Sequence, residues 1–379
     1  MTGAVLNRRV LPVLLLFLGA AALRSQEHGQ FQFMMELNYI AADRTIELVQ
    51  GIAGNPRDIA ELPGNRLASA TTGLLAGRRL TVESLQRALE SVKFNQDLGE
   101  DLYRLGETRA NALPLKELLG ELRRRNFGQR VASTVEQLFP AGAVVRGKLP
   151  VYFVAFGHEN IDAFVRRVAW RGNEPLFVGD GEGEPTIVVN LSKAIRYGRT
   201  TEERFVRLLQ TVAHEVFHAA FDAYKDTSPV WREFYSAHGT PLDALLDLTQ
   251  NEGIAYYMSL VQAQRGRLPQ DWQQRVGTSF AAFNRAAEEL SNPAISPGRI
   301  EEILRSSNTS GYWESFASMA GMVMAKHIDQ TLGRNALTES VARGPLDFFG
   351  KYLEVTRREG DAPRLTPQLV RMLQGAGVR

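Results

Sequence analysis

The segment from Thr200 to Tyr224 constrains the fold more than any other part of the sequence, because its pattern is that of one long amphipathic helix. Thr200 and Glu203 have the spacing of a capping box, in which each side chain bonds a backbone N–H at the other position. Apolar residues then recur at three- and four-residue intervals, which places them on one helical face. These residues are Phe205, Leu208, Leu209, Val212, Val216, Phe217, Ala220 and Phe221.

The regions on either side also have mainly helical patterns. From Phe31 to about Leu138 the apolar residues recur mostly at helical spacing, and Thr81 is a suitable N-cap for a helix that continues to Phe94. Pro241 is well placed to begin another helix, because proline is favoured at the first helical position. Further helices are predicted at Leu113–Leu138, Asp271–Leu290, Pro297–Arg305, Tyr312–Leu332, Leu337–Ala342 and Leu346–Thr356.

A change of character between Val144 and Leu191 indicates a small β-sheet. The runs Val151–Phe156 and Thr186–Leu191 are rich in β-branched or aromatic residues, which favour strands. Glycine and acidic residues separate the second run from Leu176–Val178, and such residues are typical of turns. The predicted fold class is therefore α+β, mainly α with a small β-sheet.

The composition excludes several classes of protein. The chain has 379 residues and no cysteine, which rules out disulfide scaffolds, cysteine-bound metal clusters and thiol nucleophiles. Any metal must be held by His, Asp, Glu or another oxygen donor. The formal charge is +2. Nucleic-acid-binding proteins usually carry a cluster of excess basic residues, so this charge does not favour a nucleic-acid partner.

The N-terminus has the order of a secretory signal. Arg8 and Arg9 precede an apolar run from Val10 to Leu23, and small alanines near its end resemble a cleavage site. The run is shorter than the roughly 20 residues of a spanning helix. We expect a signal peptide within residues 1–25, with cleavage after Ala22, and a periplasmic or extracellular mature chain without a membrane span. An uncleaved anchor is the alternative.

The long predicted helix contains the sequence His214-Glu215-Val216-Phe217-His218. Histidines four residues apart lie on one face of a helix, so both imidazoles can bind one metal ion. Glu215 is about 100° further round the helix, where its carboxylate can lie beside the ion without binding it. The pattern predicts a catalytic site for one Zn²⁺, with Glu215 as the general base that activates a zinc-bound water.

Catalytic zinc usually has three protein ligands and one open position, so a third ligand is needed. A third histidine at the metzincin position is absent, because Phe221 and Tyr224 stand where glycine and histidine would be required. His238 and Glu252 are the remaining candidates. Gly253 follows Glu252 and has no side chain to prevent close packing against the metal helix, which favours Glu252.

These motifs resemble those of the gluzincin metallopeptidases, which include thermolysin and aminopeptidase N. The resemblance rests on His214–His218 followed by Asn251-Glu-Gly-Ile-Ala-Tyr-Tyr257, within about residues 186–257. Glu252 lies 34 positions after His218, a longer gap than in the aminopeptidase N type. The layout also resembles an uncharacterised bacterial group described as secreted zinc-dependent peptidases. The resemblance implies a thermolysin-like core with Glu252 as the third ligand.

The resemblance also implies roles for neighbouring residues. Gluzincins have an edge strand before the zinc helix that pairs with substrate, and Thr186–Leu191 is either that strand or a buried structural one. They place a Tyr or His from a later helix near the developing oxyanion. Tyr312 is the first candidate for that catalytic role, with Tyr257 and His327 as alternatives. Tyr256 occupies the position of a histidine-orienting Asp in thermolysin, so Asp222, Asp243 or Asp247 would take over that role.

The predicted organisation has four parts: a signal peptide at residues 1–25, a helical region at 26–140, the sheet and zinc helix at 141–225, and a helical subdomain at 226–379 that carries Glu252. The predicted function is an exported peptidase acting on peptides or proteins. Glu159 is a possible clamp for a substrate amine, but no exopeptidase signature is found, which favours endopeptidase or oligopeptidase action. The alternatives are a helical binding protein with structural zinc and a zinc hydrolase of other amides or esters. The oligomeric state is not predicted.

Overall fold

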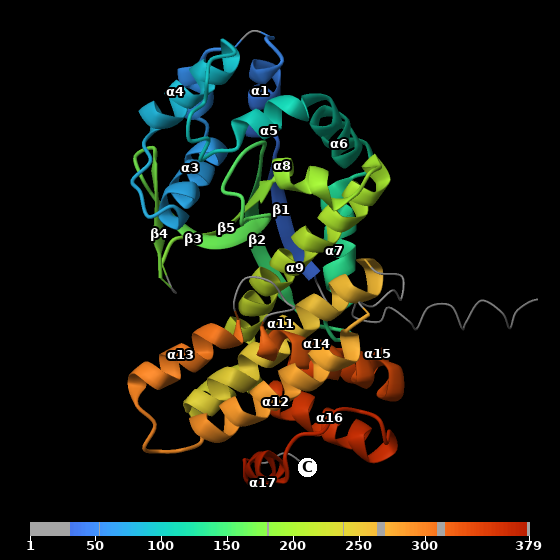
Figure 1. The fold of residues 1–379 in the computed structure, drawn as a ribbon. Helices are drawn as coiled ribbons and strands as arrows, with labels where there is room; N and C mark the ends of the chain where they lie inside the picture. Colours follow the sequence, from blue (N-terminus) through green and yellow to red (C-terminus); the bar gives the residue numbers. More distant parts are fainter. Residues whose placement is uncertain are drawn as a thin grey trace, which may run out of the picture.

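A mixed five-stranded β-sheet and the helices around it form the first half of the fold (Figure 1). The computed structural model describes residues 31–52, 54–179, 182–237, 239–263, 270–308 and 315–376. The predicted signal peptide, His238 and Tyr312 lie outside these residues. The strands are β1 (Phe31–Asn38), β2 (Val145–Val154), β3 (Ala163–Arg171), β4 (Glu174–Val178) and β5 (Glu184–Asn190).

The strand order is β1-β2-β5-β3-β4. Strands β1, β2 and β5 are parallel, whereas β3 is antiparallel to both β5 and β4. The predicted α+β class is confirmed, because helices predominate and the sheet is small. Strand β3 was not predicted, because Arg166, Arg167 and Arg171 interrupt its apolar pattern.

Strand β1 corrects the prediction that the chain is helical from Phe31. Phe31–Asn38 is a strand that pairs along its whole length with β2. Its alternate residues Phe33, Met35 and Leu37 are buried or partly buried, which is the two-residue period of a strand. The helical spacing begins only with α1 at Ile40.

Strand β5 lies inside the sheet, between β2 and β3. Thr186–Leu191 is therefore not an edge strand that could pair with substrate, and the buried structural interpretation is confirmed. Residues from Thr186 to Asn190 are buried, as expected for a strand covered on both faces. The strand leads through the short helix α8 (Leu191–Ala194) and the 3-10 turn η1 (Ile195–Tyr197) toward the long predicted helix.

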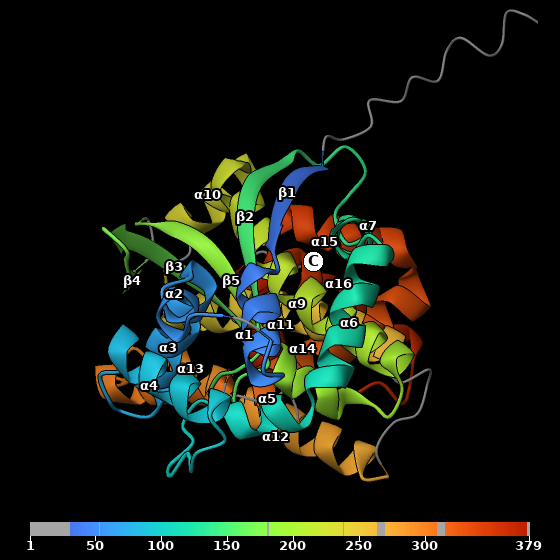
Figure 2. The ribbon, with the colours of Figure 1, turned by 90° about the horizontal axis from the view of Figure 1, so that it is seen from above.

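That helix, α9 (Thr201–Thr227), is confirmed with its capping box of Thr200 and Glu203. It packs against β2, β3 and β5, and its Phe205 ring meets Phe127 edge-on. Figure 2 shows α6 and α7 on one side of the sheet and α2, α3 and α4 on the other. The helices between β1 and β2 are α1 (Ile40–Val49), α2 (Pro56–Ala60), α3 (Pro63–Leu75), α4 (Val82–Lys93), α5 (Leu105–Ala110), α6 (Ala112–Arg124) and α7 (Phe127–Glu136).

The C-terminal helices form a second layer below the sheet in the view of Figure 1. Helix α11 begins at Pro241, as predicted, and Thr81 caps α4, also as predicted. Trp231 of α10 donates a hydrogen bond to the Val341 carbonyl and so ties α10 to α15. The helices are α10 (Pro229–Ala237), α11 (Pro241–Ala263), α12 (Trp272–Leu290), α13 (Pro297–Ser307), α14 (Phe316–Leu332), α15 (Arg334–Arg343), α16 (Pro345–Arg358) and α17 (Pro367–Gly375).

Helices α11 and α14 touch backbone to backbone at two glycines. A Cβ atom on Gly321 would lie 2.0 Å from the Thr249 carbonyl oxygen, and one on Gly253 would lie 2.3 Å from the backbone of Gly321. Gly253 therefore permits close packing against α14, whereas the sequence suggested close packing against the metal helix. This contact fixes α11 immediately beside Glu252.

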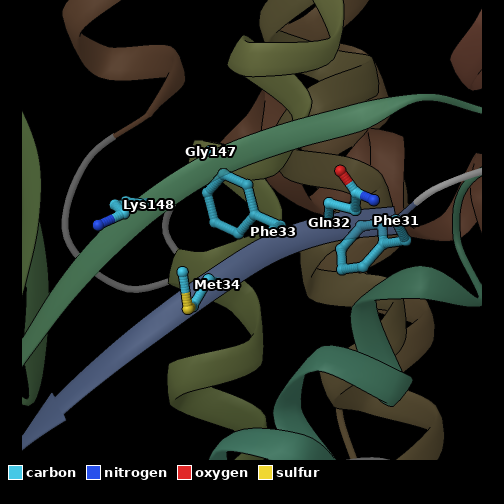
Figure 3. A pocket seen from close by; sticks show the side chains of 6 residues that line it. All are labelled: Phe31, Gln32, Phe33, Met34, Gly147 and Lys148. Carbon is cyan, nitrogen blue, oxygen red and sulfur yellow. The ribbon is translucent and has the colours of Figure 1, made fainter.

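The free edge of the sheet carries a groove of about 550 Å³ along β1 and β2 (Figure 3). The ring of Phe33 lies over Gly147, where a Cβ atom would come within 2.7 Å of the ring. Gly147 thus lets an aromatic side chain of β1 pack flat on β2. Of the helices in the described ranges, none combines the length and the hydropathy needed to cross a membrane.

Replacing Gly321 with alanine tests the close helix contact. The added methyl group cannot fit without separating α11 from α14, so we expect Gly321→Ala to lower the free energy of unfolding by about 1–3 kcal/mol. The matched control is Gly277→Ala in α12, where a Cβ atom would meet nothing within 4 Å. That change should be neutral or stabilising, because alanine favours helix. Urea unfolding of both variants is the measurement, and equal stability would contradict the packing account.

Candidate metal centre

His214 and His218 lie one turn apart on α9, and their rings converge. The two Nε2 atoms are 3.0 Å apart, and the ring centroids are separated by 4.6 Å. Both side chains are mostly buried, at 11% and 17% of their full exposure. The helical spacing therefore brings two nitrogen ligands to one point, as the sequence predicted.

Glu252 on α11 completes a cluster of three candidate ligands. Its Oε2 lies 3.7 Å from His214 Nε2 and 3.5 Å from His218 Nε2. A point equidistant from these three atoms lies about 2.0 Å from each, which matches the roughly 2.0–2.2 Å that zinc keeps to imidazole nitrogen and carboxylate oxygen. The donor set, two imidazoles and one carboxylate, is also one that suits zinc, so the residues fit one Zn²⁺.

Two amide side chains hold these ligands in place. Asn251 accepts a hydrogen bond from His218 Nδ1 at 2.9 Å, which leaves Nε2 free to bind a metal. Asn308, just after α13, donates from Nδ2 to Glu252 Oε1 at 2.7 Å. The ring of Tyr256 packs on His214 with centroids 4.3 Å apart. Asn251 adjoins Glu252 in the sequence motif, and that adjacency was the only signal that could have identified it.

Two of the three aspartates suggested for orienting a histidine have other partners. Asp243 accepts hydrogen bonds from the backbone N–H and the hydroxyl of Thr240 at the start of α11, and Asp247 accepts from Lys225 and from Tyr235. Burial raises the pKa of Asp222, and the nearby charge of His218 opposes this shift. The hydrogen bond that orients His218 instead comes from Asn251.

Glu215 lies on the same helix but outside the cluster of ligand atoms. Burial raises the pKa of its carboxyl to about 7, although the charges of His218 and Arg166 oppose the shift. Arg166 belongs to β3, a strand against which α9 packs. A carboxyl group with a pKa near neutrality can both accept and release a proton, which suits a general base.

The three candidate ligands are electrostatically coupled. Burial would lower the pKa of His218, but the adjacent Glu252 carboxylate raises it. Burial would raise the pKa of Glu252, but His218 and His214 lower it. Burial and the neighbouring His218 lower the pKa of His214 to about 3. The opposite charges of His218 and Glu252 thus stabilise each other, and binding of a metal by His218 requires its neutral form.

The residues considered for contacting the oxyanion or the substrate amine, other than Tyr312, form hydrogen bonds or ion pairs with other side chains. Tyr257 donates a hydrogen bond to Asp329 at 2.7 Å, and His327 Nδ1 lies 2.7 Å from a carboxylate oxygen of Glu359. Glu159 pairs with Arg104. Tyr312 and His238 stay predictions, because both lie outside the described residues.

A cavity of about 540 Å³ borders the cluster at Glu252 and Asn251. It lies between the end of α9, helix α10 and the first half of α11. Its polar lining includes Asp222, Asp247 and Lys225, and Phe234 and Leu248 add apolar surface. The cavity therefore reaches the carboxylate ligand Glu252 and the neighbouring Asn308, whereas neither histidine is part of its lining.

Comparison with known protein families gives a match over most of the chain. A model of the family described as "Putative zinc dependent peptidase (DUF5700)" matches residues 57–361. The chain belongs to this family. Its members are thus grouped with zinc-dependent peptidases, in agreement with a His214, His218 and Glu252 cluster that is compatible with one zinc ion. No curated protein and no solved structure matches the chain.

Two variants separate the candidate third ligands. Glu252→Gln replaces a charged oxygen ligand with a neutral amide, so we expect zinc affinity to fall by more than the 10–100-fold typical of a lost supporting hydrogen bond. His238→Ala should keep the affinity of the unchanged protein. Competition titration with a chromophoric chelator measures both. The reverse ranking would assign the third ligand to His238.

Proposed function

We propose that the protein is an exported zinc peptidase that hydrolyses peptide bonds with Glu215 as the general base. The observation that carries the proposal is the triangle of His214 Nε2, His218 Nε2 and Glu252 Oε2, whose dimensions suit a single zinc ion. The family match supports zinc-dependent peptidase chemistry in general. A peptide or protein is accordingly the proposed substrate.

The residues divide the chemistry between them. Zinc at this position would supply Lewis acidity, which polarises a substrate carbonyl and makes a water more acidic. Glu215 takes the proton of the attacking water and returns it to the amine that leaves. Its raised pKa suits both halves of the transfer. Asn251 keeps His218 in the tautomer that presents Nε2.

A catalytic role is favoured over a structural zinc site by the ligand count. Structural zinc is usually enclosed by four protein ligands, whereas catalytic zinc keeps one position open. In the part of the chain that the structure describes, the cluster contains three candidate ligands and borders a cavity. An acid–base residue adjacent to the cluster would have no use in a purely structural site.

The finer fold assignment, a thermolysin-like core, is also part of the proposal. It is supported by the order of the elements: a sheet, then the helix with both histidines, then a helix with the carboxylate ligand. Strand β4 follows β3 in the sequence and pairs with the second half of β3, Arg167–Arg171. The first half of β3 could therefore present backbone groups to an extended substrate.

Glu215→Gln tests the proposed chemistry. Glutamine preserves the size and the hydrogen-bonding capacity of the side chain but cannot act as a base near neutral pH. We expect normal zinc content and thermal stability, with turnover of peptides reduced at least about 100-fold, the lower limit of a typical general-base contribution. Equal turnover in the two proteins would refute the role of Glu215. A structural zinc site predicts no hydrolysis in either protein.

Export is proposed from the N-terminal sequence alone. The basic pair Arg8 and Arg9, the apolar run and the alanines before Arg24 are typical of a cleaved signal. Expression of the full chain in a bacterial host should yield a secreted or periplasmic form that begins near Leu23, as measured by intact mass spectrometry. A cytoplasmic product with an intact N-terminus would contradict export.

A further inference from the structure

The two carboxylate oxygens of Glu252 have different partners. Oε2 faces both histidine Nε2 atoms, whereas Oε1 accepts a hydrogen bond of 2.7 Å from the amide of Asn308. Asn308 is far from Glu252 in the sequence and follows the last residue of α13. One oxygen is thus directed at the metal position and the other is held by an uncharged donor.

Helix α13, which ends immediately before Asn308, is anchored to its neighbours. Ile303 and Ser307 are buried in the last turns of the helix, and the Ser307 hydroxyl bonds the Leu304 carbonyl. At the other end, Ser296 caps the helix through the Arg299 backbone N–H. Helix α13 also packs against α11 and α14. The amide therefore belongs to an anchored element although its own side chain is exposed.

A carboxylate with both oxygens free can bind a metal through one oxygen or through two. Binding through two would add a bond and fill the position that a catalytic zinc needs to keep open. A hydrogen bond to one oxygen makes that mode less favourable, because the donor must first be displaced. The bond also fixes the rotation of the carboxyl group, so that Oε2 stays aimed at the histidines.

We propose that Asn308 is a positioning residue that keeps Glu252 a one-oxygen ligand and so preserves an open coordination position. This inference rests on the proposed zinc site, which it deepens. Asn251 does the corresponding task for His218 from within α11, whereas Asn308 follows the end of a separate helix, α13. The zinc site therefore depends on α13 as well as on α9 and α11.

The test uses Asn308→Ala in the full chain, with Asn292→Ala as the matched control. Asn292 is also an exposed asparagine after the end of a helix, and its side-chain oxygen accepts a hydrogen bond from the nearby Ala294 N–H. Zinc affinity is measured by chelator competition, and cobalt(II) is bound in place of zinc for visible absorption spectroscopy. Four-coordinate cobalt absorbs visible light much more strongly than five- or six-coordinate cobalt.

We expect Asn308→Ala to lower zinc affinity about 10–100-fold and to weaken the cobalt absorption, while thermal unfolding of the metal-free protein is unchanged. Asn292→Ala should match the unchanged protein in all three measurements. Asn308→Asp keeps the shape but replaces the donor with a carboxylate, so it should weaken zinc binding as well. A purely structural role for Asn308 would alter stability without altering the cobalt spectrum.

Two results would overturn the inference. Unchanged zinc affinity and an unchanged cobalt spectrum in Asn308→Ala would show that the hydrogen bond does not govern the ligand. Tighter zinc binding by Asn308→Asp would show that this position can coordinate the metal directly. A third result, no zinc binding by the unchanged protein, would refute the proposed function as well as the inference. The first two results refute only the inference, because the unchanged protein still binds zinc.

Discussion

Burying imidazoles and carboxylates between packed elements is costly unless they have polar partners, and two of the four groups on α9 and α11 receive one from an asparagine. One side of α9 packs on the sheet, and another packs on α11. His218 forms a hydrogen bond with Asn251, and Glu252 accepts one from Asn308. Burial raises the pKa of the Glu215 carboxyl group. The polar groups therefore gather where the two layers of the fold meet.

The position of Glu252 depends on helices that carry no metal ligand themselves. The close contact of Gly253 with Gly321 sets how near α11 lies to α14, and Asn308 then fixes the rotation of the carboxyl group. A ligand on a second helix is accurate only if that helix cannot slide or rotate. The C-terminal layer of helices therefore has a physical role: it holds α11, and with it Glu252, in a fixed position beside α9.

Local patterns were predictable from the sequence, and pairings between distant segments were not. The Thr200 capping box and the spacing of His214 and His218 follow from the helical period alone, so both could be found without a structure. Strand β1 was missed because its parallel partner lies far along the chain and its short apolar pattern continues into a helix. The role of Asn308 depends on how α13 packs against α11, which no local pattern records.

The central claim is that His214, His218 and Glu252 hold one zinc ion. Elemental analysis of the mature protein, purified without chelator, tests it most directly, with His218→Ala analysed in parallel. The account predicts one zinc per chain in the unchanged protein and none at stoichiometric level in the variant. Absence of any divalent metal from the unchanged protein, or full zinc content in His218→Ala, would contradict it.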